Sequence, residues 1–400
     1  MIEIKNEFKT IQFAFFFTNY DAKDTRVYRF LLPKLLASHS DKFTSKSFMQ
    51  KHLEDLYGAR IYTRSELHAN LNVMSFVFTI VDPKIVNDDE LIHKSIDLLN
   101  DMFVDRNYFN ETIFNEEKRL LIEQWETLKD HKRAYANVEF GKAFFESDLA
   151  AYPLSGTIQD IKKLTLADLT NYYKNQFFKD DIKVIINGHY EAYIAYIDQH
   201  LKIKTQNQHL KPAFKFRSLK PLQKLEEETQ MNQAILKLGY LLPIYRFDSL
   251  YEAALCADIM LGGYPESRLF KEIREKQGLC YDISSNYDFY KGVITISSGV
   301  AKNQKDYALE EIIHTVESFK QQEITESELL YAKAYLIHQI KSSLDSQSYM
   351  TKRAYFKRLF NDHTTTDQRI ESIKKVTLEN IKNVVRMIEL DTTYVLYGGM

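Results

Sequence analysis

Alternating apolar and polar positions predict strands in several parts of the chain. Runs in which every second side chain is apolar are typical of half-buried strands in antiparallel sheets. These runs are "FKTIQFAFFF" (8–17), "ANLNVMSFVFTIV" (69–81) and "QAILKLGYLL" (233–242). Helices are predicted where apolar residues recur three and four positions apart, at 107–130, 248–261 and 325–345. Strands and helices do not alternate strictly, which favours an α+β fold.

A helix and the strand that follows it occur twice. "IQDIKKLTLADLTNYY" begins at Ile158 and "IESIKKVTLENIKNVV" begins at Ile370, and six of their first nine residues are identical. In each copy a threonine, Thr165 or Thr377, stands where a helix N-cap is expected, and an apolar strand ending in glycine follows. The matching order of elements indicates a duplication. We therefore predict two homologous halves, each an antiparallel sheet with helices packed on one face.

A polar segment between the two copies is predicted to join the halves. Residues 202–229 carry two prolines and show no sustained apolar period, which is typical of a linker. We place the linker at 196–229, the N-terminal half at 1–195 and the C-terminal half at 230–400. Four hundred residues exceed what one hydrophobic core usually supports, which agrees with two domains.

Composition and charge exclude several kinds of partner. Lys and Arg number 53 against 55 acidic residues, so a formal net charge of -2 gives no reason to expect nucleic acid. The N-terminus lacks the basic and then apolar order of a secretory signal, and the apolar run 13–17 is too short to span a bilayer. Two cysteines are too few for a disulfide framework or a cysteine-based zinc site. We expect a cytoplasmic protein with neither nucleic acid nor a membrane as partner.

Several segments together resemble the pitrilysin/insulinase family of zinc metallopeptidases. The likeness rests on the repeat, on "ADIMLGGYPESRLFKEIREKQGLCYDISS" (257–285) and on "ITESELLYAKAYL" (324–336). The likeness covers nearly the whole chain, and it is strongest to the bacterial, processing-protease-like subfamily. The resemblance implies two homologous α+β halves. It also implies that two chains, or two halves of a longer chain, enclose an extended peptide.

The resemblance also implies where a zinc site would lie. Active members carry His-x-x-Glu-His on an N-terminal helix, where two histidines bind zinc and the glutamate activates water. The downstream segment "LEDLYGARIYTRSE" (53–66) aligns this motif with "RFLLP", so Arg29, Leu32 and Pro33 take the places of His, Glu and His. None of the three can be a ligand or a base. Pro33 should also force a late helix start or a bend near Phe30, because a proline inside a helix costs about 3 kcal/mol.

Two carboxylates match the spacing of the family's other zinc-site glutamates. Glu116 and Glu123 are seven residues apart, but an exposed helix face is the alternative explanation for them. None of the eleven histidines forms a displaced copy of the motif. We therefore predict that this chain has lost the metal and binds no cofactor.

By the same resemblance, Arg274 and Tyr281 would act on a peptide. In the family an arginine and a tyrosine seven residues apart, in the C-terminal half, reach a peptide bound at the zinc of the opposing half. Arg274 would donate to peptide carbonyls, and the Tyr281 hydroxyl would donate to the oxyanion formed during hydrolysis. A solvated helix arginine and a strand tyrosine packed on the sheet are the alternative that spacing alone favours.

Residues beside this pair are candidates for binding the peptide backbone. Gly262 and Gly263 resemble a family loop and could let a peptide pass close to the main chain, because glycine permits close approach. Turns between helix and strand are the alternative explanation. "YDISSNYDF" and "VITISSGV" predict a hairpin whose edge, including Ser284, could accept a peptide as an added strand.

Two functional hypotheses follow. In the first, the chain is inactive alone and is the zinc-free subunit of a heterodimeric peptidase. It supplies Arg274, Tyr281 and half of the peptide chamber to a homologous, zinc-bearing partner that hydrolyses peptides. In the second, it is a catalytically inactive peptide-binding or scaffold subunit that can form a homodimer. An autonomous peptidase is disfavoured, because no helix carries a set of metal ligands and no Ser or Cys lies in a recognisable nucleophile turn.

Overall fold

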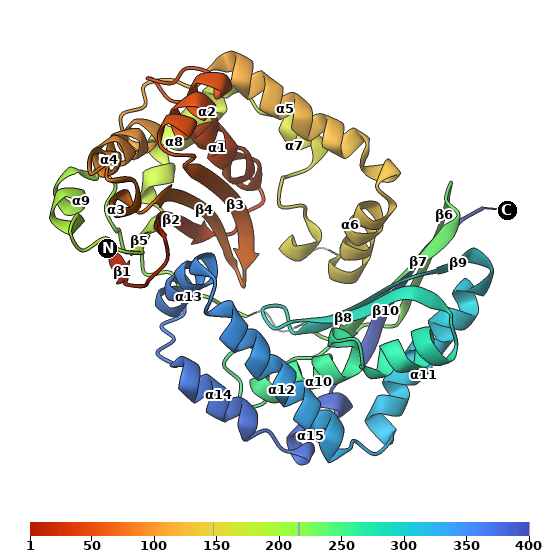
Figure 1. Ribbon diagram of the computed structural model, residues 1–400. Helices are drawn as coiled ribbons and strands as arrows, with labels where there is room; N and C mark the ends of the chain where they lie inside the picture. The colour runs from red at the N-terminus through yellow and green to blue at the C-terminus, as the bar shows by residue number, and fades with distance from the viewer. Residues whose placement is uncertain (147, 215–216, 400) are drawn as a thin grey trace. The chain divides into compact units, whose positions relative to one another are not determined.

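The chain folds into two compact units, each built on a five-stranded sheet (Figure 1). A computed structural model describes residues 1–146, 148–214 and 217–399. Unit 1 comprises Met1–Thr127, Tyr152–Ala213 and Ser343–His363, and unit 2 comprises Leu128–Ala151, Phe214–Ser342 and Thr364–Met400. No helix in the described ranges is long and apolar enough to cross a membrane.

Unit 1 contains sheet A, with the strand order β1-β5-β2-β4-β3. Neighbouring strands are antiparallel except for β1 and β5, which are parallel. The strands are β1 (Ile2–Ile4), β2 (Thr10–Tyr20), β3 (Arg60–His68), β4 (Leu71–Val81) and β5 (Asp181–Asn187). The helices are α1 (Arg26–Ser38), α2 (Lys46–Asp55), α3 (Pro83–Val86), α4 (Glu90–Phe103), α5 (Glu111–Glu126), α7 (Ile158–Lys163), α8 (Leu166–Asn175), α9 (Ile194–His200) and α13 (Gln347–Leu359).

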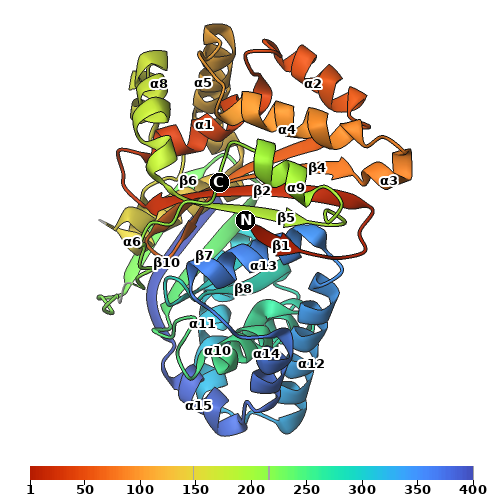
Figure 2. The same ribbon diagram turned by 90° about the vertical axis from the view of Figure 1, so that its left-hand side faces the viewer.

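Both faces of the middle of sheet A are covered. Side chains alternate along a strand, so Phe13, Phe15 and Phe17 of β2 point into the main core of unit 1. Phe16 points to the other face, where Tyr355 of α13 stacks on it with ring centroids 4.0 Å apart. Figure 2 shows α13 running beside β1 and β5 on this face. This burial on both sides explains the unbroken apolar run in β2.

Unit 2 repeats this topology in sheet B, with the strand order β6-β10-β7-β9-β8 and a parallel pair formed by β6 and β10. The strands are β6 (Gln223–Thr229), β7 (Gln233–Leu241), β8 (Cys280–Asp288), β9 (Val293–Ala301) and β10 (Glu389–Gly398). The helices are α6 (Lys132–Phe145), α10 (Tyr251–Asp258), α11 (Lys305–Gln321), α12 (Glu326–Ser343), α14 (Thr366–Lys374) and α15 (Leu378–Arg386).

Each sheet receives a helix from the other half of the sequence. Helix α6 lies between α5 and α7 along the chain, yet it packs on sheet B. Its Phe144 ring lies directly on β7, where a Cβ added to Gly239 would come within 2.6 Å of the ring. Helix α13 lies between α12 and α14 along the chain, yet it packs on sheet A. The compact units therefore differ from a simple division of the chain into halves.

The predicted α+β fold with two homologous halves is confirmed, because the two sheets have the same strand order and the same parallel pair. Both threonine N-caps are also present. The Thr165 hydroxyl accepts from the Asp168 amide at 3.1 Å, and the Thr377 hydroxyl accepts from the Asn380 amide at 3.2 Å. The sheets are mixed rather than wholly antiparallel, because the first strand of each unit joins the sheet in parallel.

The last seven residues of the predicted linker form strand β6. Its sequence, QKLEEET, is charged and is only half-buried on alternate residues, as an edge strand can be. Such a strand has no sustained apolar pattern, so the sequence did not predict it. The division of the chain into 1–195, a linker at 196–229 and 230–400 stays a prediction.

Candidate functional site

The position of the zinc motif falls on α1, where Arg29 is buried with 1% of its surface exposed. Its guanidinium donates from Nε to Asn72 Oδ1 (2.9 Å) and from Nη1 to Asp180 Oδ2 (2.6 Å) and the Tyr172 hydroxyl (3.0 Å). Nη2 donates to the carbonyls of Phe17 and Asn72, both at 2.9 Å. These acceptors occupy all five N–H donors of an arginine. A saturated cation therefore stands where the resemblance places the family's first zinc ligand.

Leu32 and Pro33 are also buried in unit 1. The helix begins at Arg26 and continues through Pro33, so the predicted late start is wrong. Proline has no N–H, and the carbonyl of Arg29, four residues earlier, therefore loses its helical donor. The Ser65 hydroxyl on β3 donates to this carbonyl instead, at 2.7 Å. This bond satisfies the carbonyl that lacks its helical donor, and it explains how the helix accommodates the proline.

The two carboxylates of the predicted motif lie on α5 and are paired with cations. Glu116 lies 3.2 Å from Lys46 Nζ, and Glu123 lies 2.5 Å from Arg119 Nη1. Their side chains are 44% and 49% exposed, as on an ordinary helix surface. No group of three or more His, Cys, Asp or Glu able to hold a metal occurs among the residues described. The residues at the five motif positions do not fit a zinc ion.

Arg274 lies on a segment of unusual backbone geometry. Helix α10 continues into a π-helical segment at Ile259–Gly263, and a second π-helical segment follows at Phe270–Lys276. Single-turn π segments are rare in proteins and often occur at functional sites. Gly278, with φ of +64°, ends the second segment, and β8 begins two residues later. Arg274 is thus carried on a short, wide turn beside the edge strand of sheet B.

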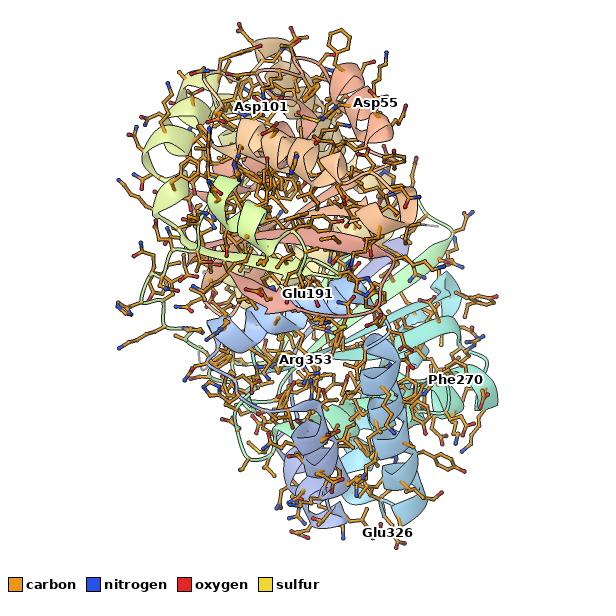
Figure 3. The ribbon with its side chains drawn as sticks, turned by 60° about the vertical axis from the view of Figure 1, so that its left-hand side comes forward. Asp55, Asp101, Glu191, Phe270, Glu326 and Arg353 are labelled. Carbon is orange, nitrogen blue, oxygen red and sulfur yellow. The ribbon has the colours of Figure 1, made fainter. Side chains whose placement is uncertain are left out.

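Two aromatic rings hold the Arg274 side chain. Its guanidinium carbon lies 4.4 Å from the centroid of the Phe270 ring and 5.5 Å from that of the Tyr281 ring. Such cation–π contacts attract the guanidinium to the rings and use none of its N–H donors. No acceptor or carboxylate in the described ranges bonds to these donors. Figure 3 labels Phe270 on its short helical turn in unit 2.

A β-bulge points Tyr281 out of the sheet. Cys280 pairs with Val300 and Asp282 pairs with Gly299, so Tyr281 is an extra residue on β8 without a partner on β9. Bulges at sheet edges re-aim side chains in this way. The Tyr281 side chain is 82% exposed, and its hydroxyl is open to a ligand. Arg274 and Tyr281, which the family resemblance predicts as a pair, are in contact. Their role in catalysis stays a prediction.

Gly262 and Gly263 end the first π segment where it meets β8. A Cβ on Gly262 would come within 2.7 Å of the Ser285 amide nitrogen, so the fold itself requires glycine there. Below this contact, Asp258 accepts from the Ser285 hydroxyl at 2.6 Å and from the Tyr287 amide at 3.2 Å. Burial raises the pKa of Asp258 to about 6, and these two hydrogen bonds partly offset the rise. The binding role predicted for the two glycines stays a prediction.

Sequence reasoning missed two parts of this site. Phe270 stands four residues before Arg274, a spacing that places two side chains on one face of a helix and could have suggested the contact. Arg133 of α6 donates to both carboxylate oxygens of Asp282 at 2.7 Å, beside Tyr281. Nothing in the local sequence signals this pair, because the two residues are 149 positions apart. The predicted peptide-binding residue Ser284 lies on β8 and is exposed.

Comparison with known proteins relates this chain to peptidases. Residues 163–336 match the family model described as "Peptidase M16 inactive domain". "Probable inactive metalloprotease YmfF" of Bacillus subtilis (strain 168) is 24% identical, over 99% of this chain and 95% of that protein. "Uncharacterized zinc protease YmxG" of the same organism is 26% identical, over 75% of this chain and 73% of that protein.

Solved structures share the fold. A conserved protein from Enterococcus faecalis V583 superposes with a TM-score of 0.89 at 24% identity, covering 99% of this chain and 96% of that one. A protease from Helicobacter pylori superposes with a TM-score of 0.80 at 16% identity, covering 98% of this chain and 96% of that one. The likeness in fold extends over both units.

Proposed function

This chain is a member of the M16 peptidase family that lacks the zinc-binding motif, and from that premise we propose that it is the zinc-free subunit of a two-chain peptidase. It supplies Arg274, Tyr281 and half of the peptide chamber to a homologous partner that carries the complete motif. The partner provides the metal, and this chain provides hydrogen-bond donors to the peptide.

One observation carries the proposal: the N–H donors of Arg29 are all engaged within the described part of the protein, whereas those of Arg274 are not. Arg29, in the place of a zinc ligand, has all of its donors engaged by the protein. Arg274 contacts two aromatic rings, and its donors make no hydrogen bond or ion pair with the residues that the structure describes. A surface arginine without a function would usually be mobile and solvated, whereas a preorganised one loses less entropy on binding. In this proposal Arg29 stabilises the fold of the half that lacks the zinc motif, whereas Arg274, in the other half, serves to bind a peptide.

The two residues have separate tasks in this proposal. The Arg274 guanidinium donates to backbone carbonyls of an extended peptide and holds its register. The Tyr281 hydroxyl donates to the oxygen on which negative charge develops as the peptide bond is attacked. Losing one such donor typically slows catalysis by roughly 100- to 1000-fold. Neither residue can itself activate water, so the chain alone is inactive. The word "inactive" in the description of the matching family model and in the name of the Bacillus subtilis relative agrees with this.

Affinity purification of the tagged chain from native lysate, at moderate salt, tests the partnership. The proposal predicts a co-purifying chain of similar length that carries His-x-x-Glu-His, near-equimolar amounts of the two, and about one zinc per pair. A chain that elutes alone or as a homodimer, binds extended peptides and stimulates no cleavage would overturn it. That result would favour an inactive peptide-binding or scaffold subunit.

A further inference from the structure

We infer that the face of sheet B on which α6 packs also carries, toward β9 and β8, a subsite for a carboxylate group of the bound peptide, with Lys237 as its charged residue. The inference rests on the proposed function, because it assigns a class of peptide to the same chamber wall. It adds a source of specificity that the Arg274 and Tyr281 pair, which recognises backbone, does not provide.

Strand register places Lys237 in a polar row across three strands. Lys237 of β7 lies opposite Ser297 of β9, and Ser297 lies opposite Ser284 of β8. Residues directly opposite in antiparallel strands point to the same face, with Cβ atoms about 4.5–5.5 Å apart. The neighbouring residues of β7, Leu236 and Leu238, point to the opposite face and into the core of unit 2. On its other side Lys237 lies opposite Tyr394 of β10. The row therefore consists of an ammonium group with a tyrosine on one side and two serine hydroxyls on the other.

The charges around Lys237 do not balance. Arg133 already binds both carboxylate oxygens of Asp282 at 2.7 Å. Lys237 has no hydrogen bond or ion pair within the described part of the chain. Of the two charges that act most strongly on Lys237, Arg133 and Asp282 are paired with each other, so the Lys237 ammonium has no carboxylate partner of its own. A half-buried ammonium without a partner carries a desolvation penalty, which an incoming anion would offset.

Other carboxylates on this side of the sheet are already engaged. Glu227 of β6 accepts from the Tyr135 hydroxyl at 2.6 Å and from the Tyr394 hydroxyl at 2.8 Å. Glu139 of α6 binds Lys142 at 2.7 Å. Neither carboxylate therefore serves as the missing partner of the Lys237 ammonium.

The electrostatics of Lys237 agree with this geometry. Burial, and then the Arg133 charge, lower the pKa of Lys237 to about 8, although Asp282 acts in the opposite direction. The ammonium form is therefore still the main form at neutral pH. A bound carboxylate would stabilise that form and raise its pKa. Binding of an acidic peptide should accordingly weaken as pH rises through about 8, well below the range of an ordinary lysine.

The carboxylate can come from two sources, an acidic side chain or the C-terminus of the peptide. Four fluorescein-labelled peptides of one extended sequence separate them: with a central Glu or Gln, and each with a free or an amidated C-terminus. Binding is measured by fluorescence anisotropy with the isolated complex or, if none forms, with the chain itself. The variants are Lys237→Met, Lys237→Arg and, as a control, Lys224→Met at an exposed lysine of β6.

We expect the wild-type protein to bind peptides that carry the recognised carboxylate about tenfold more tightly than their neutral counterparts, as for a charge-assisted hydrogen bond. Lys237→Met should remove this preference, Lys237→Arg should keep most of it, and Lys224→Met should leave it unchanged. The source is identified by whether the central Glu or the free C-terminus gives the gain.

Two results would overturn the inference in distinguishable ways. If all four peptides bind and Lys237→Met changes none of their relative affinities, the subsite is wrong and the proposed function stands. If none of the peptides binds, the proposed function and the subsite fail together. Circular dichroism spectra matching wild type confirm that each variant is folded.

Discussion

Replacing Arg29 tests whether the former metal position has become a structural one. The substitution Arg29→Met keeps the length of the side chain and removes its five donors. It leaves the Asp180 carboxylate, 1% exposed, without its cation. Removing one partner of a buried ion pair typically costs about 3–5 kcal/mol. Since a domain is stable by about 5–15 kcal/mol in total, unit 1 should lose a large part of its stability.

The chain contains a convenient reporter for this unit. Trp125 is the only tryptophan in the sequence and lies on α5 in unit 1. Its indole nitrogen donates to the Ser155 hydroxyl at 3.2 Å. Its fluorescence during urea denaturation therefore follows unit 1. With a urea dependence of about 2–3 kcal/mol per M, the expected loss moves the midpoint down by roughly 1–2.5 M.

Two further variants complete the test. Adding Asp180→Asn to Arg29→Met removes the uncompensated charge, so the double variant should be more stable than Arg29→Met alone. Arg119→Met, which breaks an exposed pair on α5, should change the free energy of unfolding by less than about 1 kcal/mol. If Arg29→Met costs no more than Arg119→Met, the buried network is not what holds this region together.

Three further predictions concern other parts of the fold. Burial, and then the neighbouring Arg106, lower the pKa of His39 to about 4, so its neutral form stabilises the fold above the unfolded pKa of about 6.5. As pH falls from about 6.5 to about 4, the wild type should lose up to about 3 kcal/mol relative to His39→Asn, measured by urea denaturation at each pH. Gly262→Ala should cost about 1–3 kcal/mol and displace β8, because its Cβ meets the Ser285 amide. Phe144→Ala should cost about 3–5 kcal/mol in unit 2, measured by thermal unfolding.

Each of these predictions has a matched control. His338 is exposed on α12, and His338→Gln should change the free energy of unfolding by less than about 1 kcal/mol. A Cβ on Gly263 meets its nearest atom at 3.3 Å, so Gly263→Ala should cost less than Gly262→Ala. Leu149 is 40% exposed, and Leu149→Ala should have little effect beside Phe144→Ala. Equal effects of variant and control would contradict the reasoning in each case.

The repeat in the sequence was enough to predict the two homologous halves, because a duplicated helix and strand dictate the same sheet order in both. Local signals also located the Thr165 and Thr377 caps. The exchange of α6 and α13 could not be predicted. An apolar stripe shows that a helix packs against something, and it does not identify which of two sheets provides the surface.

The candidate site was predicted only in part, because local sequence signals do not reveal contacts between residues that are far apart in the chain. The family resemblance singled out Arg274 and Tyr281, because both lie in the one short segment that carries the resemblance. The bulge that exposes Tyr281 depends on pairing with β9, and the saturation of Arg29 depends on Asn72 and Asp180, which are 43 and 151 positions away. Contacts at such separations leave no trace in local periodicity.

The most direct test of the central proposal is the rate of peptide hydrolysis by the reconstituted pair when this chain carries Tyr281→Phe. The substitution removes one hydroxyl from an exposed ring, so folding, pairing and the zinc content of the complex should match the wild type. The proposal predicts that kcat falls by roughly 100- to 1000-fold. An unchanged kcat in a complex of normal composition would show that Tyr281 takes no part in the reaction.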